Sequence, residues 1–140
     1  MDIETVRAKM LAQVEQARAS AMARAYGWAF ELEDLTLYVM MPHRRRPDHV
    51  FLLRVAFDDF PRRAPSYVFV DRATKELVPH AWPPNVKHDD AQLPGICTPG
   101  TRGFHEKWHL NDAQHPWDPD LYTVLDTLQR IHAMMEKGIG

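Results

Sequence analysis

Apolar positions recur at helical spacing over the first part of the chain, and charged residues occupy the positions between them. The apolar set is Ile3, Val6, Met10, Val14, Ala17 and Ala21. A repeat of three to four residues is typical of an amphipathic helix. Asp2 is suited to the N-cap and Gly27 to the end of that helix. The pattern predicts one helix over residues 2–26.

After this segment the spacing between apolar residues shortens, and the chain becomes rich in β-branched and aromatic residues. The expected strands cover residues 28–32, 35–41, 50–57 and 67–71, with short polar turns between them. Consecutive strands joined by short connections pair antiparallel. We therefore expect a four-stranded antiparallel meander.

Regular patterning is lost between Arg72 and Pro119, where Pro, His, Asp and Gly accumulate. Loops of this length inside a compact domain are usually functional. Beyond it, Leu121, Val124 and Leu128 begin an apolar helical face that predicts a helix over residues 119–137, with Pro119 in its first turn. The order of elements predicts an α+β fold with a single domain over residues 1–140.

Composition narrows the function classes. The chain has 17 Lys and Arg against 19 Asp and Glu, a formal charge of -2, whereas dedicated nucleic-acid binders usually carry a basic excess. A single cysteine forms no internal disulfide. No stretch approaches the roughly 20 apolar residues of a membrane span. We expect a cytoplasmic protein with neither a nucleic acid nor a membrane as its partner.

The single cysteine, Cys97, lies in the long loop between Pro94-Gly95 and Pro99-Gly100. Proline and glycine on both sides hold a loop in a defined irregular path, which suits a segment that presents a reactive side chain. The alternative is a buried, inert cysteine that acts as a small apolar side chain. An acyl-transfer thiol needs access and a pKa near its ordinary value.

Histidines surround Cys97 in the sequence, namely His88, His105, His109 and His115. Neutral imidazole is suited to proton transfer, so His105 or His109, with Glu106 beside them, are candidates to assist chemistry at the thiol. Two alternatives are histidines that are simply solvated in the loop, and zinc held by Cys97 with His105, His109 and His115, although the spacing fits no standard zinc finger. We expect no metal and no cofactor.

Two further groups of residues are expected to have structural roles. The run from His43 to Arg46 falls between two strands and is expected to be a solvated hairpin tip, with a docking patch for an acidic partner as the alternative. Trp82, Trp108 and Trp117 are expected to anchor the long loop to the body of the domain.

Four motifs follow one another along the chain: Phe57 to Val70 with its prolines Pro61 and Pro65, Pro84-Asn85-Val86, Gly95-Ile96-Cys97, and Trp117-Asp118-Pro119. Taken in this order, they resemble motifs of the ubiquitin-conjugating enzymes (UBC-like fold). Phe57 to Val70 is similar to the family's strand, Tyr-Pro turn and second proline, with Phe60-Pro61 in place of Tyr-Pro. Pro84-Asn85-Val86 resembles the end of the His-Pro-Asn motif, and Gly95-Ile96-Cys97 the approach to the family's cysteine. Trp117-Asp118-Pro119 resembles the Trp-x-Pro before the next helix. The resemblance covers nearly the whole chain.

The departures point to a particular branch of the family. Pro83 stands where the family has its motif histidine, and residues 98–117 form a longer segment than in the eukaryotic enzymes. One helix follows the cysteine, where eukaryotic members usually add two more. These features are similar to compact bacterial members, which are typically encoded beside an activating enzyme and a ubiquitin-like protein in anti-phage (antiviral defence) systems.

The resemblance implies a transferase. An activating enzyme, meeting the first helix, would pass a ubiquitin-like protein to Cys97 as a thioester, and an amine on a protein target would then attack it. Asn85 would stabilise the oxyanion, while His105 or His109, with Glu106, would assist loss of the amine's proton. The alternatives are an inactive module of the same fold that binds a ubiquitin-like protein, and a small zinc-binding protein.

Overall fold

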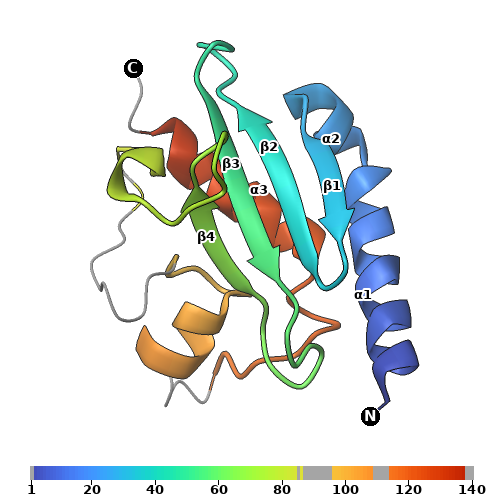
Figure 1. Ribbon diagram of the computed structural model, residues 1–140. Helices are drawn as coiled ribbons and strands as arrows, with labels where there is room; N and C mark the ends of the chain where they lie inside the picture. The colour runs from blue at the N-terminus through green and yellow to red at the C-terminus, as the bar shows by residue number, and fades with distance from the viewer. Residues whose placement is uncertain (1, 85, 87–95, 109–113, 138–140) are drawn as a thin grey trace.

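The computed structural model describes residues 2–84, 86, 96–108 and 114–137, and every structural statement below concerns these residues. The chain forms an α+β domain in which helices precede and follow one sheet (Figure 1). In chain order, the helices and strands are α1 (Ile3–Arg18), α2 (Ala21–Tyr26), β1 (Ala29–Glu33), β2 (Thr36–Pro42), β3 (Val50–Ala56), β4 (Ser66–Val70) and α3 (Val124–Glu136).

The N-terminal helix is interrupted, so the prediction of one helix over residues 2–26 was wrong. Asp2 caps α1 by accepting the Thr5 N–H, as expected. At the break, the Ser20 hydroxyl donates to the Ala17 carbonyl at 2.7 Å and accepts the Ala23 N–H at 3.0 Å. One serine thus closes α1 and caps α2, because its side chain replaces backbone partners at both helix ends. Gly27 ends α2 with a φ of 71°.

The antiparallel meander is confirmed, with strand order β1-β2-β3-β4 and each strand within one residue of its predicted limits. Across the sheet, Val39 pairs with Leu53, and Leu53 pairs with Phe69. All three side chains have no exposed surface. Because side chains alternate across a strand, this register places them on one face, which is the face that forms the core.

Helix α3 lies across one face of the sheet, and α1 runs along the side of β1 (Figure 1). Leu128, Ile131 and Met135 of α3 are fully buried in the same apolar cluster as the inner strand residues. The side-chain amide of Gln13 joins the two helices: it donates to the Pro119 carbonyl at 2.7 Å, and its oxygen accepts the Val124 N–H at 2.9 Å.

Helix α3 begins five residues later than the expected start at Pro119. Thr123 is its N-cap, with a side chain that accepts the Asp126 N–H. Pro119 instead offers its carbonyl to Gln13. The capping hydroxyl decides the start of the helix here, since it satisfies an N–H that has no partner within the first turn.

The long segment after β4 is more regular than a structureless loop. It contains a short 3₁₀ helix, Pro79–Ala81, and a turn of π-helix, Phe104–Trp108 (η2), after Cys97. Trp82 is buried against Phe69, and the Trp117 indole donates to the Pro61 carbonyl at 2.8 Å. These two tryptophans anchor the segment to the domain as expected.

The β2–β3 hairpin tip differs from its prediction at one residue. His43 is 1% exposed rather than solvated. Its Nδ1 accepts the backbone N–H groups of Arg45 and Arg46, and its Nε2 lies 3.3 Å from the Glu136 carbonyl oxygen. The three arginines that follow are exposed as expected. The imidazole replaces solvent as the partner of the turn amides, which is why it is buried.

Candidate active site around Cys97

Cys97 is the exposed residue of a buried stretch. Ile96 is 1% exposed and Thr98 is 6% exposed, while the Cys97 side chain between them is exposed. Ile96 belongs to the core cluster that includes the inner strand residues and α3. Burial of both neighbours fixes the backbone on either side of the cysteine, so the thiol is presented from a structured segment.

A buried threonine organises the turn that follows. The Thr101 hydroxyl lies 2.6 Å from the Ile96 carbonyl oxygen and 2.8 Å from that of Thr98, so its one proton is shared between them. The same oxygen accepts the Phe104 N–H at 3.2 Å. Thr101 therefore joins the residues before Cys97 to the start of η2.

The turn rests directly on α3. Gly100 has a φ of 99°, and a Cβ added there would lie 2.1 Å from the Thr127 Oγ1. The Arg130 guanidinium donates to the Pro99 carbonyl at 3.2 Å. Only glycine permits both this backbone conformation and this approach to the helix. The turn that follows Cys97 is thereby fixed against α3, which is itself part of the core.

His105 faces inward. Its side chain is 8% exposed, and its Nε2 accepts the Gly100 N–H at 3.1 Å. The ring centroid lies 5.0 Å from that of Tyr122 and 5.6 Å from that of Trp117. A backbone amide is always the donor, so Nε2 carries no proton here, and in the neutral ring Nδ1 carries it. In this arrangement the imidazole has no free lone pair with which to accept a proton.

Glu106 is held by an arginine from a different part of the chain. The Arg63 guanidinium donates to both carboxylate oxygens, with Nη2–Oε1 at 2.6 Å and Nε–Oε2 at 3.0 Å. Hydrogen bonding to Arg63 lowers the pKa of Glu106, although partial desolvation opposes it. A carboxylate with a lowered pKa is a weak proton acceptor at neutral pH.

A second arginine ties the same segment to the β3–β4 connection, residues 57–65. The Arg102 Nε donates to the Ala64 carbonyl at 3.0 Å, and its Nη1 lies 3.0 Å from the Asp58 carboxylate. The Arg102 N–H donates to the Pro65 carbonyl at 2.9 Å. The β3–β4 connection, which has a cis peptide bond at Phe60-Pro61, therefore lies against the segment that follows Cys97.

Burial raises the pKa of the Cys97 thiol above its ordinary value. Removing part of the solvent around a group disfavours its charged form, and the thiolate is the charged form here. At neutral pH the group is therefore mostly the thiol. The thiolate is the nucleophile, so a partner that removes the proton would be required for fast acyl transfer.

Of the predicted site residues, Cys97, His105 and Glu106 lie in the described segment 96–108, where His105 bonds to the Gly100 amide and Glu106 to Arg63. Asn85 and His109 lie outside the described residues. Thr101, Arg63 and Arg102 organise the site but were not singled out from the sequence. Arg63 lies within the motif Phe57 to Val70, yet nothing local in that motif indicates a partner 43 residues away.

Within the described ranges, no three His, Cys, Asp or Glu side chains are grouped closely enough to hold a metal ion. Of the four ligands in the alternative zinc site, His109 lies outside those ranges, and the Nε2 of His105 is directed at the Gly100 amide. The candidate zinc site therefore has no geometric support from the residues that the structure places.

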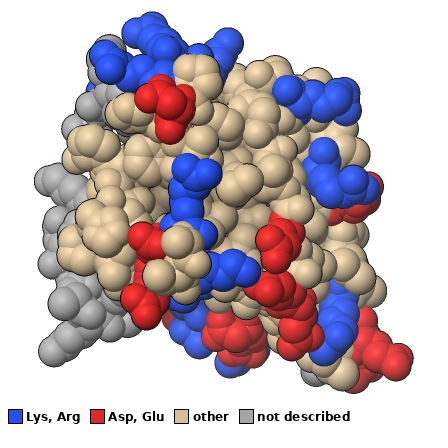
Figure 2. All heavy atoms as spheres, turned by 45° about the horizontal axis from the view of Figure 1, so that its top comes forward, with Lys and Arg blue, Asp and Glu red and all other residues tan. Residues whose placement is uncertain are grey.

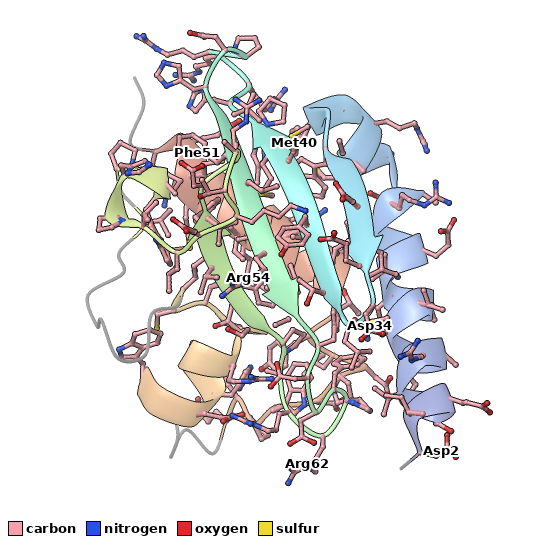
Figure 3. All side chains as sticks on the ribbon, viewed as in Figure 1. Asp2, Asp34, Met40, Phe51, Arg54 and Arg62 are labelled. Carbon is pink, nitrogen blue, oxygen red and sulfur yellow. The ribbon has the colours of Figure 1, made fainter. Side chains whose placement is uncertain are left out.

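Charge is distributed unevenly over the surface. Figure 2 shows Lys and Arg side chains gathered at the end of the molecule that carries the β2–β3 hairpin tip, while acidic and basic side chains lie side by side along the lower edge of this view. Arg44, Arg45 and Arg46 form that tip, and Arg44 lies 4.8 Å from the centre of the Tyr26 ring. On the lower β3–β4 connection, Arg62 points away from the body (Figure 3) and pairs with Asp59.

An open hollow of about 270 Å³ lies at the other end of β4. Its floor includes Leu52 and Val70, and its rim includes the ion pair of Asp71 with His80. None of the residues that line it belongs to the segment around Cys97. No helix in the described part of the chain is long and apolar enough to cross a membrane.

Neither known family models nor curated proteins match this sequence.

Proposed function

We propose that the protein is a compact ubiquitin-conjugating-enzyme-like transferase that carries a ubiquitin-like protein as a thioester on Cys97. The observation that carries the proposal is the exposure of this one thiol between two buried neighbours, Ile96 and Thr98. The helix, antiparallel sheet, long segment and helix occur in the order that the sequence resemblance implies.

Two acyl transfers make up the reaction. The Cys97 thiolate attacks the thioester carbonyl on an activating enzyme, forming a new carbon–sulfur bond and expelling the donor's thiolate. An amine on a target protein then attacks the Cys97 thioester. This step forms an amide and releases Cys97 as a thiolate, while the amine's proton passes to a base.

The described residues favour some roles over others. His105 and Glu106 are engaged with Gly100 and Arg63, so neither is placed as a free base. We retain His109 as the candidate for proton removal and Asn85 as the candidate oxyanion donor, both from the sequence resemblance. Because burial raises the pKa of Cys97, the proposed reaction needs a group that accepts the thiol proton before attack.

The test uses a ubiquitin-like protein and an activating enzyme of the kind that the resemblance implies, with ATP, and a non-reducing gel. The proposal expects an adduct that disappears with thiol reductant and is absent in Cys97→Ala. In Cys97→Ser we expect an ester that survives reductant. No adduct, with a fully loaded activating enzyme, would contradict the transferase role; retained noncovalent binding would then identify the inactive binding module.

A position control is available because the chain has a single cysteine. Ala73 is exposed in the turn after β4, so Ala73→Cys in the Cys97→Ala background supplies an exposed thiol away from the site and from α1. We expect this variant to accept no reductant-sensitive adduct. Equal loading at both positions would mean that exposure alone, rather than the site, accounts for the reaction.

A further inference from the structure

The position of His105 does not suit a base that faces solvent. Its ring lies among Phe104, Trp117 and Tyr122, at centroid distances between 4.9 and 5.6 Å. It is 8% exposed. An apolar side chain would fill the same space, so the histidine needs a further reason, and the bond of its Nε2 to Gly100 provides one.

The Gly100 amide needs a partner that regular structure does not supply. At a φ of 99°, and in contact with Thr127, the residue belongs to no helix or strand. Its N–H is buried, and a buried amide without a partner costs roughly 1–3 kcal/mol. The Nε2 of His105 accepts this N–H at 3.1 Å. The imidazole thus satisfies a donor that the tight turn creates.

This hydrogen bond lies three residues from the thiol. Other contacts also hold this turn: the Thr101 hydroxyl on the Ile96 and Thr98 carbonyls, the Thr101 N–H on the Thr98 carbonyl, and the Arg130 guanidinium on the Pro99 carbonyl. Each holds a carbonyl. The His105 contact holds the N–H of the residue at which the chain reverses, so its loss would free the turn where Cys97 is presented.

We propose that His105 is a positioning residue for Cys97, acting through the Gly100 amide rather than by transferring a proton. The kinetic part of this inference rests on the proposed carrier function, whereas the positioning part does not. The acceptor atom is the essential property. A side chain that offers an acceptor at the same reach would replace histidine, and an apolar side chain of similar volume would not.

Two substitutions separate these properties. In His105→Gln, the side-chain oxygen can occupy the place of Nε2 and accept the Gly100 N–H. In His105→Phe, the aromatic volume remains and the acceptor is lost. His80→Phe serves as the control, because His80 is exposed and lies in the segment between β4 and Trp82. Urea unfolding of all variants shows which of them keep the fold.

The first readout needs no partner protein. Cys97 is labelled with a trifluoromethyl ketone reagent, and its ¹⁹F spectrum is recorded with the hydrogen exchange of the Gly100 amide. We expect one sharp resonance and a protected amide in the wild type, His105→Gln and His80→Phe. In His105→Phe we expect broadening or several resonances and at least tenfold faster exchange. An unchanged spectrum and unchanged exchange in a folded His105→Phe would overturn the proposal.

The second readout is the rate of thioester formation on Cys97. Positioning predicts a loss of about tenfold in His105→Phe and substantial recovery in His105→Gln. If His105 were instead a proton acceptor, both variants would lose the amine-transfer step equally, which would contradict positioning. If the wild type forms no thioester, the carrier function fails, while the ¹⁹F and exchange results still decide the role of His105.

Discussion

The Arg63 guanidinium donates hydrogen bonds from two nitrogens to the Glu106 carboxylate, at 2.6 Å and 3.0 Å, although the two residues are 43 positions apart in the sequence. Together with the Arg102–Asp58 pair, it holds η2 against the β3–β4 connection. The segment after Cys97 is therefore supported on one side by α3, through Gly100, and on the other by this connection.

We expect Arg63→Ala and Glu106→Gln each to lower the free energy of unfolding by about 0.5–1 kcal/mol. Both side chains are about one third exposed, at 37% and 35%, and partly exposed ion pairs contribute little even when forked. Urea unfolding of the two single variants and the double variant measures their coupling. A coupling energy near zero would mean that the forked contact does not hold η2.

The Gly100 turn should be far less tolerant than the other glycine with positive φ. Gly100→Ala adds backbone strain and a clash with Thr127, and we expect a loss of about 2–4 kcal/mol in unfolding free energy. Gly27→Ala is the control. Its φ is 71°, and a Cβ added there would lie 3.6 Å from the Pro42 Cγ. Only backbone strain remains, at about 1 kcal/mol. Equal losses would show that α3 moves to make room.

Buried His132 predicts acid sensitivity. Its Nδ1 accepts the Trp28 indole N–H at 2.9 Å, and its Nε2 lies 2.8 Å from the Glu136 carboxylate. Burial lowers its pKa, opposed by Glu136, while Arg44 and His43 add to the lowering. The ring is therefore neutral in the folded state at neutral pH. A proton on Nδ1 would point at the Trp28 indole N–H, so two donors would face each other.

The sign of the pH effect follows from this lowered pKa. The unfolded chain binds a proton on His132 at about pH 6.5, while the folded protein binds it only at lower pH. Stability is complete above about pH 6.5 and declines as the pH falls, by at most about 1.4 kcal/mol per unit. In urea unfolding between pH 5 and 7.5, His132→Phe should be less stable at pH 7.5 and show a flatter profile. An unchanged slope would contradict the assignment.

The raised pKa of Cys97 predicts slow reaction with small electrophiles at neutral pH. The rate of iodoacetamide alkylation should rise about tenfold per pH unit and still be rising at pH 9, since only the thiolate reacts. The Ala73→Cys, Cys97→Ala variant provides the comparison. Its solvent-exposed thiol should alkylate faster at pH 8, and a Cys97 that reacted faster would show an activated thiol instead.

Local signals in the sequence were sufficient for most of the fold. The Asp2 cap, the glycine after α2 and the alternation of the four strands each depend on residues close together in the chain, and each appears as predicted. The same reasoning failed at Ser20 and at Thr123, where one hydroxyl decides a helix limit. Both residues are common caps, but their neighbours also permit a continuous helix, and packing decides between the two.

The site was predictable only in part. Proline and glycine around Cys97 indicated a structured segment that presents a thiol, and that expectation agrees with its exposure. The orientations of His105 and Glu106 were beyond local reasoning. Each depends on a partner, Gly100 or Arg63, whose position is set by how a turn packs on α3 and how the β3–β4 connection folds back.

By itself, then, the sequence determined the four strands, the order of helix, sheet and helix, and the one residue able to form a thioester, because periodicity and residue chemistry act over a few residues. Only the tertiary structure decided which groups those residues face. By residue type alone, His105 and Glu106 could be a proton acceptor and its partner, but the fold buries the histidine and pairs the glutamate with Arg63. Long-range packing, by burying one and pairing the other, is what gives them different chemistry.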